Sequence, residues 1–350
     1  MKFIFVLRQL STGGAEVATA LLTQELARRQ HQIEIWNTGP ASQADIEYWQ
    51  QWSQIKKVNK KLIFFYSRDP KAQVILVDNI GSGYFPVNQA ISILHGDCTR
   101  KLYQTNNPLK RVVEKVKLWR KYARRTNISI SKTLMARLQA HSRIEQLYIP
   151  NPFDLDKVRQ MAQHQPSVSL PDEFIIHVGR MSPEKRQTLL LDTYLQTPEL
   201  NQKLQLVFVG GEHEGSDTIA QINSKAKAAQ LAEQVHCLGD ISNPWPIMKR
   251  AKCLVLCSKF ESMGYVLLEA MALGIPIIAS DTVGAREVLG DTFPGITYDS
   301  ALGSSIADAI RQPEKYTKSV PKTYSITQVT DLFENAIAQH GTQKNKTAPI

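Results

Sequence analysis

The stretch from Cys253 to Gly290 constrains the fold more than any other part of the chain, because its pattern follows the order of one βαβ unit. An apolar run at 253–257 predicts a buried strand, and the small polar residues at 258–264 predict a turn. The run YVLLEAMAL at 265–273 predicts a helix ending at Gly274, and 275–279 predicts the next buried strand. This order predicts an open α/β domain with a parallel sheet.

Two glutamates mark this unit: Glu261 lies in the turn and Glu269 lies eight residues later, on the helix. A helix N-terminus that follows a parallel strand offers free N–H groups to phosphate. A carboxylate nearby suits the hydroxyls of a sugar or a ribose better than it suits phosphate. A capping and a surface glutamate would be the ordinary interpretation. Glu269, however, interrupts an apolar helix, and a buried carboxylate is unfavourable without a partner, so we favour a ligand-binding role.

The pattern around these glutamates resembles the E-x(7)-E signature of retaining glycosyltransferases of glycosyltransferase family 4. It reads Ser258-x-x-Glu261-x-x-Gly264-x-x-x-x-Glu269-Ala270-Met271-Ala272-x-Gly274-x-Pro276-Ile277-Ile278-Ala279. The resemblance implies the GT-B fold, an α/β architecture with two Rossmann-like domains facing across a cleft. It also implies that Glu261 contacts donor-sugar hydroxyls, that Glu269 contacts the nucleotide ribose, and that the backbone of Met263, Gly264 and Tyr265 binds the sugar and diphosphate.

The length of 350 residues suits two domains better than one core. We predict an acceptor-binding domain at 1–152, a nucleotide-sugar-binding domain at 153–323, a helix at 324–340 that returns to the first domain, and a disordered tail at 341–350. The closely spaced prolines Pro150 and Pro152 fit a hinge. No run of apolar residues reaches the length of a membrane span. The four cysteines lack C-x-x-C spacing, which favours free thiols in a reducing cytoplasm.

Several further residues are candidates for the same site. A strand at 173–178 leads to Gly179 and Arg180, with Lys185 opening the next helix, and two cations at a sheet edge suit a diphosphate leaving group. Gly211 follows another strand. In the first domain, Gly13 and Gly14 precede a helix at 15–29, where a backbone without Cβ can approach a ligand. His95 ends a strand at 90–94, and in the family a strand-end histidine contacts the donor sugar.

Positive charge is concentrated in the first domain. Residues 1–150 hold 23 Lys and Arg against 10 Asp and Glu, whereas the remaining 200 residues are slightly acidic. Ten of these cations lie between Arg100 and Arg125, where apolar residues recur at helical spacing: Leu109, Val112, Val113, Val116, Trp119 and Tyr122. We interpret this segment as a helix whose apolar stripe faces the core. Its basic face would suit an anionic membrane or a lipid-linked acceptor.

These observations, with the family resemblance, predict a retaining glycosyltransferase that moves a hexose from a nucleotide sugar, expected to be a UDP-sugar, to a cell-surface glycan or a lipid-linked acceptor such as a lipopolysaccharide core or capsule precursor. We expect it in the cytoplasm, at the inner membrane face. No metal is expected, because the only D-x-D string, at 154–156, is better explained as helix-start acids. The alternatives are a GT-B epimerase or phosphorylase, a GDP-mannose-dependent mannosyltransferase, and an RNA-binding protein. The last is disfavoured because no aromatic-basic platform is present, so no nucleic-acid partner is expected.

Overall fold

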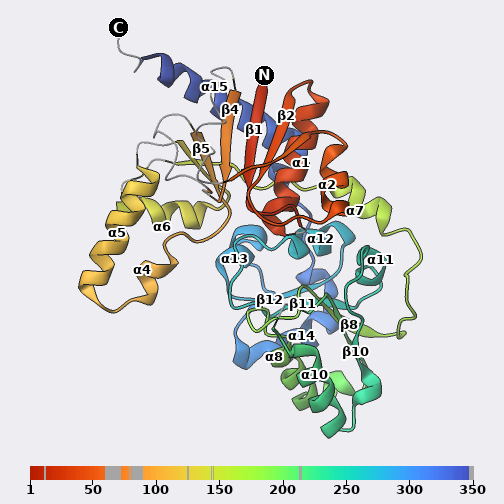
Figure 1. Ribbon diagram of the computed structural model, residues 1–350. Coiled ribbons are helices and arrows are strands. Elements are labelled where there is room, and N and C mark those ends of the chain that lie inside the picture. The colour runs from red at the N-terminus through yellow and green to blue at the C-terminus, as the bar shows by residue number, and fades with distance from the viewer. Residues whose placement is uncertain are drawn as a thin grey trace. The chain divides into compact units, whose positions relative to one another are not determined.

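The structure is a computed structural model of the chain. It describes residues 1–346 except 12, 60–71, 79, 81–89, 124, 125, 143, 145, 213 and 214. The chain forms two compact units, one made of Met1–Phe153 with Pro321–Ile350 and the other of Asp154–Val320 (Figure 1). No helix of the described ranges has both the length and the apolar character of a membrane span.

The first unit is built on a sheet whose neighbouring strands pair in parallel, in the order β3-β2-β1-β4-β5-β6-β7. Its strands are β1 (Lys2–Leu7), β2 (Gln32–Asn37), β3 (Gln54–Lys57), β4 (Ala72–Val77), β5 (Ala90–Leu94), β6 (Thr126–Ser129) and β7 (Gln146–Tyr148). Its helices are α1 (Gly14–Arg28), α2 (Gln43–Gln50), α4 (Arg100–Gln104), α5 (Pro108–Tyr122), α6 (Lys132–Ser142) and α15 (Ile326–Lys346). The strand order reverses between β1 and β4, which is where ligands bind in open α/β sheets.

The last helix, α15, belongs to the first unit, as predicted. Phe333 of α15 stacks on Phe5 of β1, with ring centroids 6.0 Å apart. Arg29 donates hydrogen bonds to Asp331 over 2.7 Å and to Glu334 over 2.5 Å. The predicted tail is wrong for residues 341–346, which continue the helix. Gly341 disfavours a helix by only about 1 kcal/mol, and its Gln and Lys neighbours are good helix formers; residues 347–350 lie outside the described part.

The basic segment differs from its prediction in two ways. It forms two helices, because Asn107 caps the N-terminus of α5 and Pro108 is its first residue. The face of α5 that packs on the unit carries Leu118 and Tyr122, in a cluster with Leu94 and Leu138. Tyr122 of the predicted core-facing stripe is buried as predicted, but the other five residues are at least half exposed: Leu109 (77%), Val112 (60%), Val113 (50%), Val116 (50%) and Trp119 (52%). Helical spacing reveals an apolar face but does not say where it points.

The second unit holds another parallel sheet, in the order β10-β9-β8-β11-β12-β13. Its strands are β8 (Phe174–Val178), β9 (Gln205–Val209), β10 (Val235–Cys237), β11 (Cys253–Leu256), β12 (Ile277–Ser280) and β13 (Ile296–Thr297). Its α-helices are α7 (Leu155–Met161), α8 (Gln187–Gln196), α9 (Pro198–Asn201), α10 (Thr218–Ala228), α11 (Trp245–Met248), α12 (Tyr265–Leu273), α13 (Val283–Leu289) and α14 (Leu302–Arg311). Here the strand order reverses between β8 and β11. The prediction of two Rossmann-like domains is confirmed.

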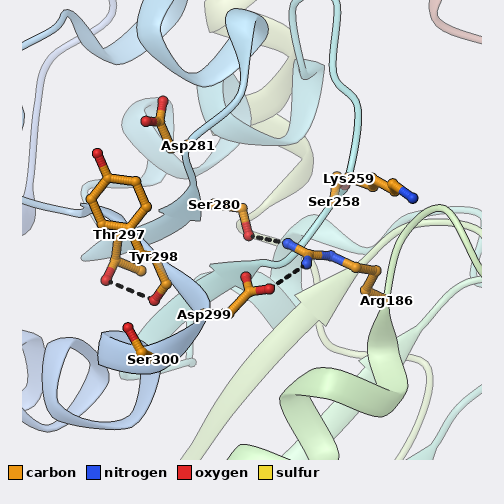
Figure 2. A pocket seen from close by; sticks show the side chains of 9 residues that line it. All are labelled: Arg186, Ser258, Lys259, Ser280, Asp281, Thr297, Tyr298, Asp299 and Ser300. Atoms are coloured by element: carbon orange, nitrogen blue, oxygen red, sulfur yellow. Dashed lines mark hydrogen bonds and ion pairs between the residues drawn. The ribbon is translucent and has the colours of Figure 1, made fainter. Parts of the chain in front are cut away.

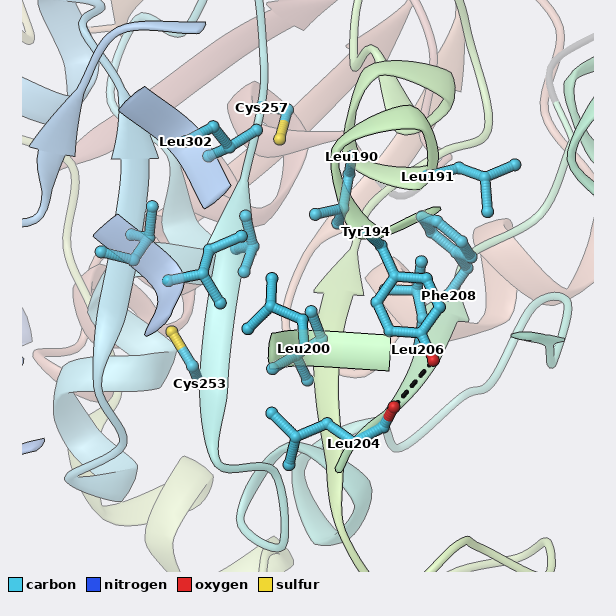
Figure 3. Packing of buried hydrophobic residues seen from close by; sticks show 14 of the residues in the cluster. Leu190, Leu191, Tyr194, Leu200, Leu204, Leu206, Phe208, Cys253, Cys257 and Leu302 are labelled. Atoms are coloured by element: carbon cyan, nitrogen blue, oxygen red, sulfur yellow. Dashed lines mark hydrogen bonds between the residues drawn. The ribbon is translucent and has the colours of Figure 1, made fainter. Parts of the chain in front are cut away.

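An apolar core lies between one face of this second sheet and the helices α8, α10 and α14 (Figure 3). Tyr194 of α8 is buried in it, and its hydroxyl donates a hydrogen bond to the carbonyl of Leu204 over 2.7 Å, so the polar end of the side chain is satisfied. Cys253 and Cys257 are free and buried, and burial raises the pKa of the Cys257 thiol to about 12. Asp154 caps α7 by accepting from the Lys157 amide over 2.9 Å, as predicted for the D-x-D string.

Candidate active site

The turn predicted to bind the donor lies between β11 and α12. Gly264 caps α12 with a φ of +74°, a conformation that residues with a Cβ rarely adopt. Gly284 of α13 packs against this turn. A Cβ on Gly284 would stand 2.7 Å from the Met263 amide nitrogen, and the Gly284 amide donates to the Glu261 carbonyl over 2.9 Å. Gly284 therefore packs against the backbone of the turn and helps to fix it. The sequence analysis did not predict this role for Gly284.

The Glu261 carboxylate is bound from two sides. Its Oε1 accepts a hydrogen bond from the Ser258 hydroxyl over 2.7 Å and forms an ion pair with the Lys185 ammonium. Lys185 follows β8 and Glu261 follows β11, so the two residues meet where the strand order reverses, 76 residues apart in sequence. Both side chains retain some exposure, 24% for Lys185 and 11% for Glu261. A cation and a carboxylate are thus held together within reach of a ligand.

The backbone after β8 is fixed by close packing. A Cβ on Gly210 would stand 2.1 Å from the Gly179 carbonyl oxygen, and both glycines have positive φ. Buried Gln187 donates to the Arg180 carbonyl over 2.7 Å. The Arg180 side chain is exposed. Sequence reasoning chose Gly211, where a Cβ would meet only Asp240 at ordinary contact distance, and it missed Gly210 and Gln187. The sequence signal for this close packing was a glycine directly after each of two neighbouring strands, β8 and β9.

Glu269 lies on α12, in the second turn after the glutamate-containing loop. Burial raises the pKa of Glu269 to about 7, with the indole N–H of Trp245 acting in the opposite direction. The same carboxylate adds to the effect of burial in raising the pKa of Tyr265. The Trp245 indole nitrogen is buried and has no hydrogen-bond partner among the described residues. A carboxylate with a pKa near 7 is partly protonated at neutral pH. Carboxylates with such a raised pKa are common at ligand-binding sites.

The predicted residues of the first unit form a separate cluster at the reversal point of its own sheet. His95 follows β5, and its amide donates to the Asp78 carboxylate over 3.0 Å. Gly13 caps α1, where a Cβ would stand 2.3 Å from a carboxylate oxygen of Glu16. Burial raises the pKa of Glu16, and the charge of Asp78 adds to the shift. Asp78 and Glu16 were not predicted; both lie beside predicted residues.

A pocket of about 540 Å³ lies beside the glutamate-containing turn, at the ends of β11, β12 and β13 (Figure 2). We call it the Arg186 pocket. It is lined by Arg186, Ser258, Lys259, Ser280, Asp281, Thr297, Tyr298, Asp299 and Ser300. Ser258 therefore contacts both the pocket and Glu261. The described residues contain no group of three or more His, Cys, Asp or Glu side chains arranged to hold a metal ion.

Comparison with known proteins identifies the second unit. Residues 160–323 match the family model for glycosyl transferases group 1. An N-acetylgalactosamine-N,N'-diacetylbacillosaminyl-diphospho-undecaprenol 4-alpha-N-acetylgalactosaminyltransferase of Campylobacter jejuni is 33% identical over 142 residues, 40% of this chain and 36% of that protein. A phosphatidyl-myo-inositol mannosyltransferase of Mycobacterium leprae is 29% identical over 167 residues, 46% of this chain and 42% of that protein. The matched stretches thus span less than half of these relatives.

Solved structures match over nearly the whole chain. HepE of Anabaena, solved with UDP and glucose, superposes with a TM-score of 0.74 at 17% identity, covering 97% of this chain and all of that one. WaaG, a glycosyltransferase involved in lipopolysaccharide biosynthesis, gives 0.65 at 15% identity, covering 97% and 95%. At these identities the likeness shows the fold alone. The chain therefore has the GT-B fold, and residues 160–323, nearly all of its second unit, match the family model for glycosyl transferases group 1.

Proposed function

We propose that the protein is a retaining glycosyltransferase that transfers a hexose from a UDP-sugar to a hydroxyl of a glycan or lipid-linked saccharide, such as a lipopolysaccharide core or capsule precursor. The observation that carries this proposal is the contact of Lys185 with Glu261 at the β8/β11 reversal point of a group 1 domain. A cation for a diphosphate and a carboxylate for sugar hydroxyls are the two groups that a nucleotide-sugar donor needs there. The structure of HepE with UDP and glucose supports the choice of nucleotide.

On donor binding, Lys185 and Glu261 would separate and contact different parts of the nucleotide sugar. Lys185 and exposed Arg180 would bind the diphosphate, whose negative charge grows as the bond from the sugar C1 to its oxygen breaks. Glu261, released from Lys185, would accept hydrogen bonds from the sugar. The acceptor oxygen attacks C1 on the face from which the diphosphate leaves, and its proton passes to the leaving oxygen. In the free protein the two charges neutralise each other, which avoids an unpaired charge at a partly buried site.

The roles of the two glutamates can be separated by isothermal titration calorimetry with free UDP, which has a ribose but no hexose. Glu269→Ala should weaken UDP binding, because the ribose loses its acceptor, whereas Glu261→Ala should leave it nearly unchanged. The opposite pattern would show that the roles are exchanged. Titration with GDP tests the nucleotide, and a screen of UDP-sugars with product mass identifies the sugar. Tight GDP binding without UDP binding would contradict the choice of UDP.

The role of the two cations is tested by Arg180→Ala and Lys185→Ala. Each should fold normally and lose transition-state stabilisation of roughly 1.5–3 kcal/mol, the usual loss for a charge-assisted hydrogen bond, or about 10- to 150-fold in kcat/KM. Exposed Lys227, on α10 of the same unit, provides a matched control as Lys227→Ala. Normal turnover in both site variants would remove this edge from the reaction.

We further propose that α5 brings the protein to an anionic membrane surface, where a lipid-linked acceptor is found. Its exposed stripe, made of Leu109, Val112, Val113, Val116 and Trp119, points away from the buried face at Leu118 and Tyr122. Lysines and arginines flank the stripe. An exposed apolar stripe with basic flanks is the arrangement of helices that lie in the headgroup region. Figure 1 shows α4 and α5 beside one another within the first unit.

This arrangement predicts two separable contributions to vesicle binding. Changing Lys110, Lys115 and Lys117 together to Gln should reduce binding to phosphatidylserine vesicles at low salt, by about 1 kcal/mol per charge. Changing Val112, Val116 and Trp119 together to Gln should remove the part of the binding that survives high salt, because apolar burial is not screened. A triple Lys→Gln variant at 203, 227 and 249 of the second unit is the control. Equal binding by all three variants would overturn the membrane proposal.

A further inference from the structure

The Arg186 pocket is built on a strained residue. Arg186 has a φ of +54° and a ψ of 40°, a left-handed conformation that glycine adopts without strain and residues with a Cβ rarely adopt. Its guanidinium donates from Nε to the Cys257 carbonyl over 2.7 Å, from Nη1 to Asp299 over 2.7 Å and from Nη2 to the Ser280 hydroxyl over 3.0 Å. The strained backbone is stabilised because this one side chain joins the segment after β11, the last residue of β12 and the segment after β13, and so forms the base of the pocket.

The charged groups of the lining are mostly paired with each other. Arg186 is neutralised by Asp299, and Asp281 accepts two hydrogen bonds from Arg286 over 2.6 and 2.8 Å. The Lys259 ammonium lies 6.0 Å from the centre of the Phe260 ring, and Figure 2 shows its side chain pointing away from both aspartates. Paired charges still offer N–H groups and carboxylate oxygens to a ligand, but they do not attract an isolated ion strongly.

The rest of the lining is rich in hydroxyls and has one open aromatic face. Hydroxyl groups come from Ser258, Ser280, Thr297, Tyr298 and Ser300. Ser258 already donates to Glu261, so its hydroxyl is left as an acceptor for a ligand. Ser280, which accepts from Arg186, can still donate. The Tyr298 side chain is 67% exposed, so its ring presents an apolar surface at the pocket. The volume of about 540 Å³ falls within the range of small-molecule sites, roughly 300–1,000 Å³. An apolar ligand would leave these polar groups unpaired, whereas a ring with hydroxyls at its edge and C–H groups on its faces would satisfy both features.

We propose that the Arg186 pocket binds a neutral hexose residue of a glycan, separately from the nucleotide-sugar donor. The sugar ring would lie against Tyr298, with its hydroxyls hydrogen-bonded to the Arg186–Asp299 pair and the serines. The binding does not depend on the proposed transfer reaction. The pocket adjoins the donor turn. Ser258 lines the pocket, and its hydroxyl donates a hydrogen bond to Glu261 of the turn over 2.7 Å. A bound glycan would thus contact the turn through Ser258 and Lys259, which both line the pocket.

Saturation-transfer NMR on the full chain tests this proposal with four probes: the methyl α-glycosides of glucose, galactose, mannose and N-acetylglucosamine. At least one should bind. Tyr298→Ala should weaken that binding about fivefold or more, the usual worth of an aromatic contact, and should leave the melting temperature unchanged because the side chain is exposed. Ser300→Ala should weaken it less. Tyr103→Ala, an exposed tyrosine in the first unit, is the matched control and should have no effect.

The donor turn is the competing place for a sugar, so the measurement is repeated with saturating UDP-glucose, which fills the hexose position, and with Glu261→Ala, which removes the group proposed to bind the donor-sugar hydroxyls. Binding that persists in both and is lost in Tyr298→Ala supports the pocket. Binding that UDP-glucose or Glu261→Ala abolishes, while Tyr298→Ala leaves it intact, would place the sugar at the donor turn and overturn the proposal. The absence of binding by all four glycosides would also overturn it, as would displacement of the bound glycoside by inorganic phosphate, which would show an anion site instead. None of these outcomes depends on turnover, so a failure here is distinguishable from a failure of the transfer proposal.

Discussion

Helices α5 and α12 both contain many apolar residues, but their environments are opposite. In α5 the apolar residues are interspersed with lysines and arginines, whereas α12 carries a single charged residue, Glu269. In α12 most of the apolar residues are buried, and one carboxylate, Glu269, is partly buried beside them. In α5 most of the apolar residues are exposed and the cations lie beside them. The difference teaches that helical periodicity identifies a face, whereas the partner of that face is decided by what the rest of the fold offers to it.

The largest expected effect comes from shortening a buried side chain of α12. Leu267 has no solvent exposure, so Leu267→Ala removes apolar contacts and leaves a cavity. The free energy of unfolding should fall by about 2–5 kcal/mol. Urea unfolding followed by circular dichroism measures it. A loss as small as that of a surface variant would mean that α12 is not packed as described and would remove the contrast with α5.

The second effect concerns the Glu269 carboxylate and depends on pH. The pKa of Glu269 is raised from 4.5 to about 7 in the folded protein, so the folded state binds the proton more tightly than the unfolded chain does. Wild-type stability should therefore fall as pH rises from about 4.5 through 7. Glu269→Gln keeps the shape without the charge, so its stability advantage should grow over this window to at most about 3 kcal/mol.

Melting temperatures of both proteins between pH 5 and 8, without nucleotide, measure this advantage. A difference between wild type and Glu269→Gln that stays constant across the window would contradict the raised pKa. Addition of UDP provides a further comparison. A ribose that hydrogen-bonds to the ionised carboxylate should shrink the pH dependence of the wild type and leave that of the variant unchanged.

The smallest effect is expected on α5. Val113 is half exposed, so Val113→Ala removes little packing and replaces a β-branched residue by the best helix former. The free energy of unfolding should change by less than about 0.5 kcal/mol. The same urea titration used for Leu267→Ala gives a direct comparison. A large loss of stability would show that the stripe packs against the protein, and the membrane proposal would lose its basis.

The sequence allowed the strands, the two-domain architecture and the glutamate turn to be predicted, because these depend on local pattern. Apolar runs between glycine-rich turns define β8, β11 and β12, and the fold follows from their order. The residues that support the site depend instead on contacts between distant segments. Gly284 meets the donor turn, Gln187 holds the Arg180 carbonyl and Arg186 joins three segments, and no local pattern reveals such contacts. The resemblance to a family supplied roles for Glu261 and Glu269, but it did not indicate the environment that raises the pKa of Glu269.

The path of the chain has a further consequence. It leaves the first unit after Phe153 and re-enters it at Pro321, and the two crossing points are neighbours, because the Phe153 amide donates to the Tyr324 carbonyl over 2.7 Å and Phe153 bridges Ser325. The second unit is therefore an insertion whose ends are held together by its host. Such an insert can be exchanged at two adjacent junctions without cutting a sheet. A chimaera that keeps α1, α15 and their Arg29 ion pairs and takes residues 154–320 from a relative would therefore need only these two adjacent junctions.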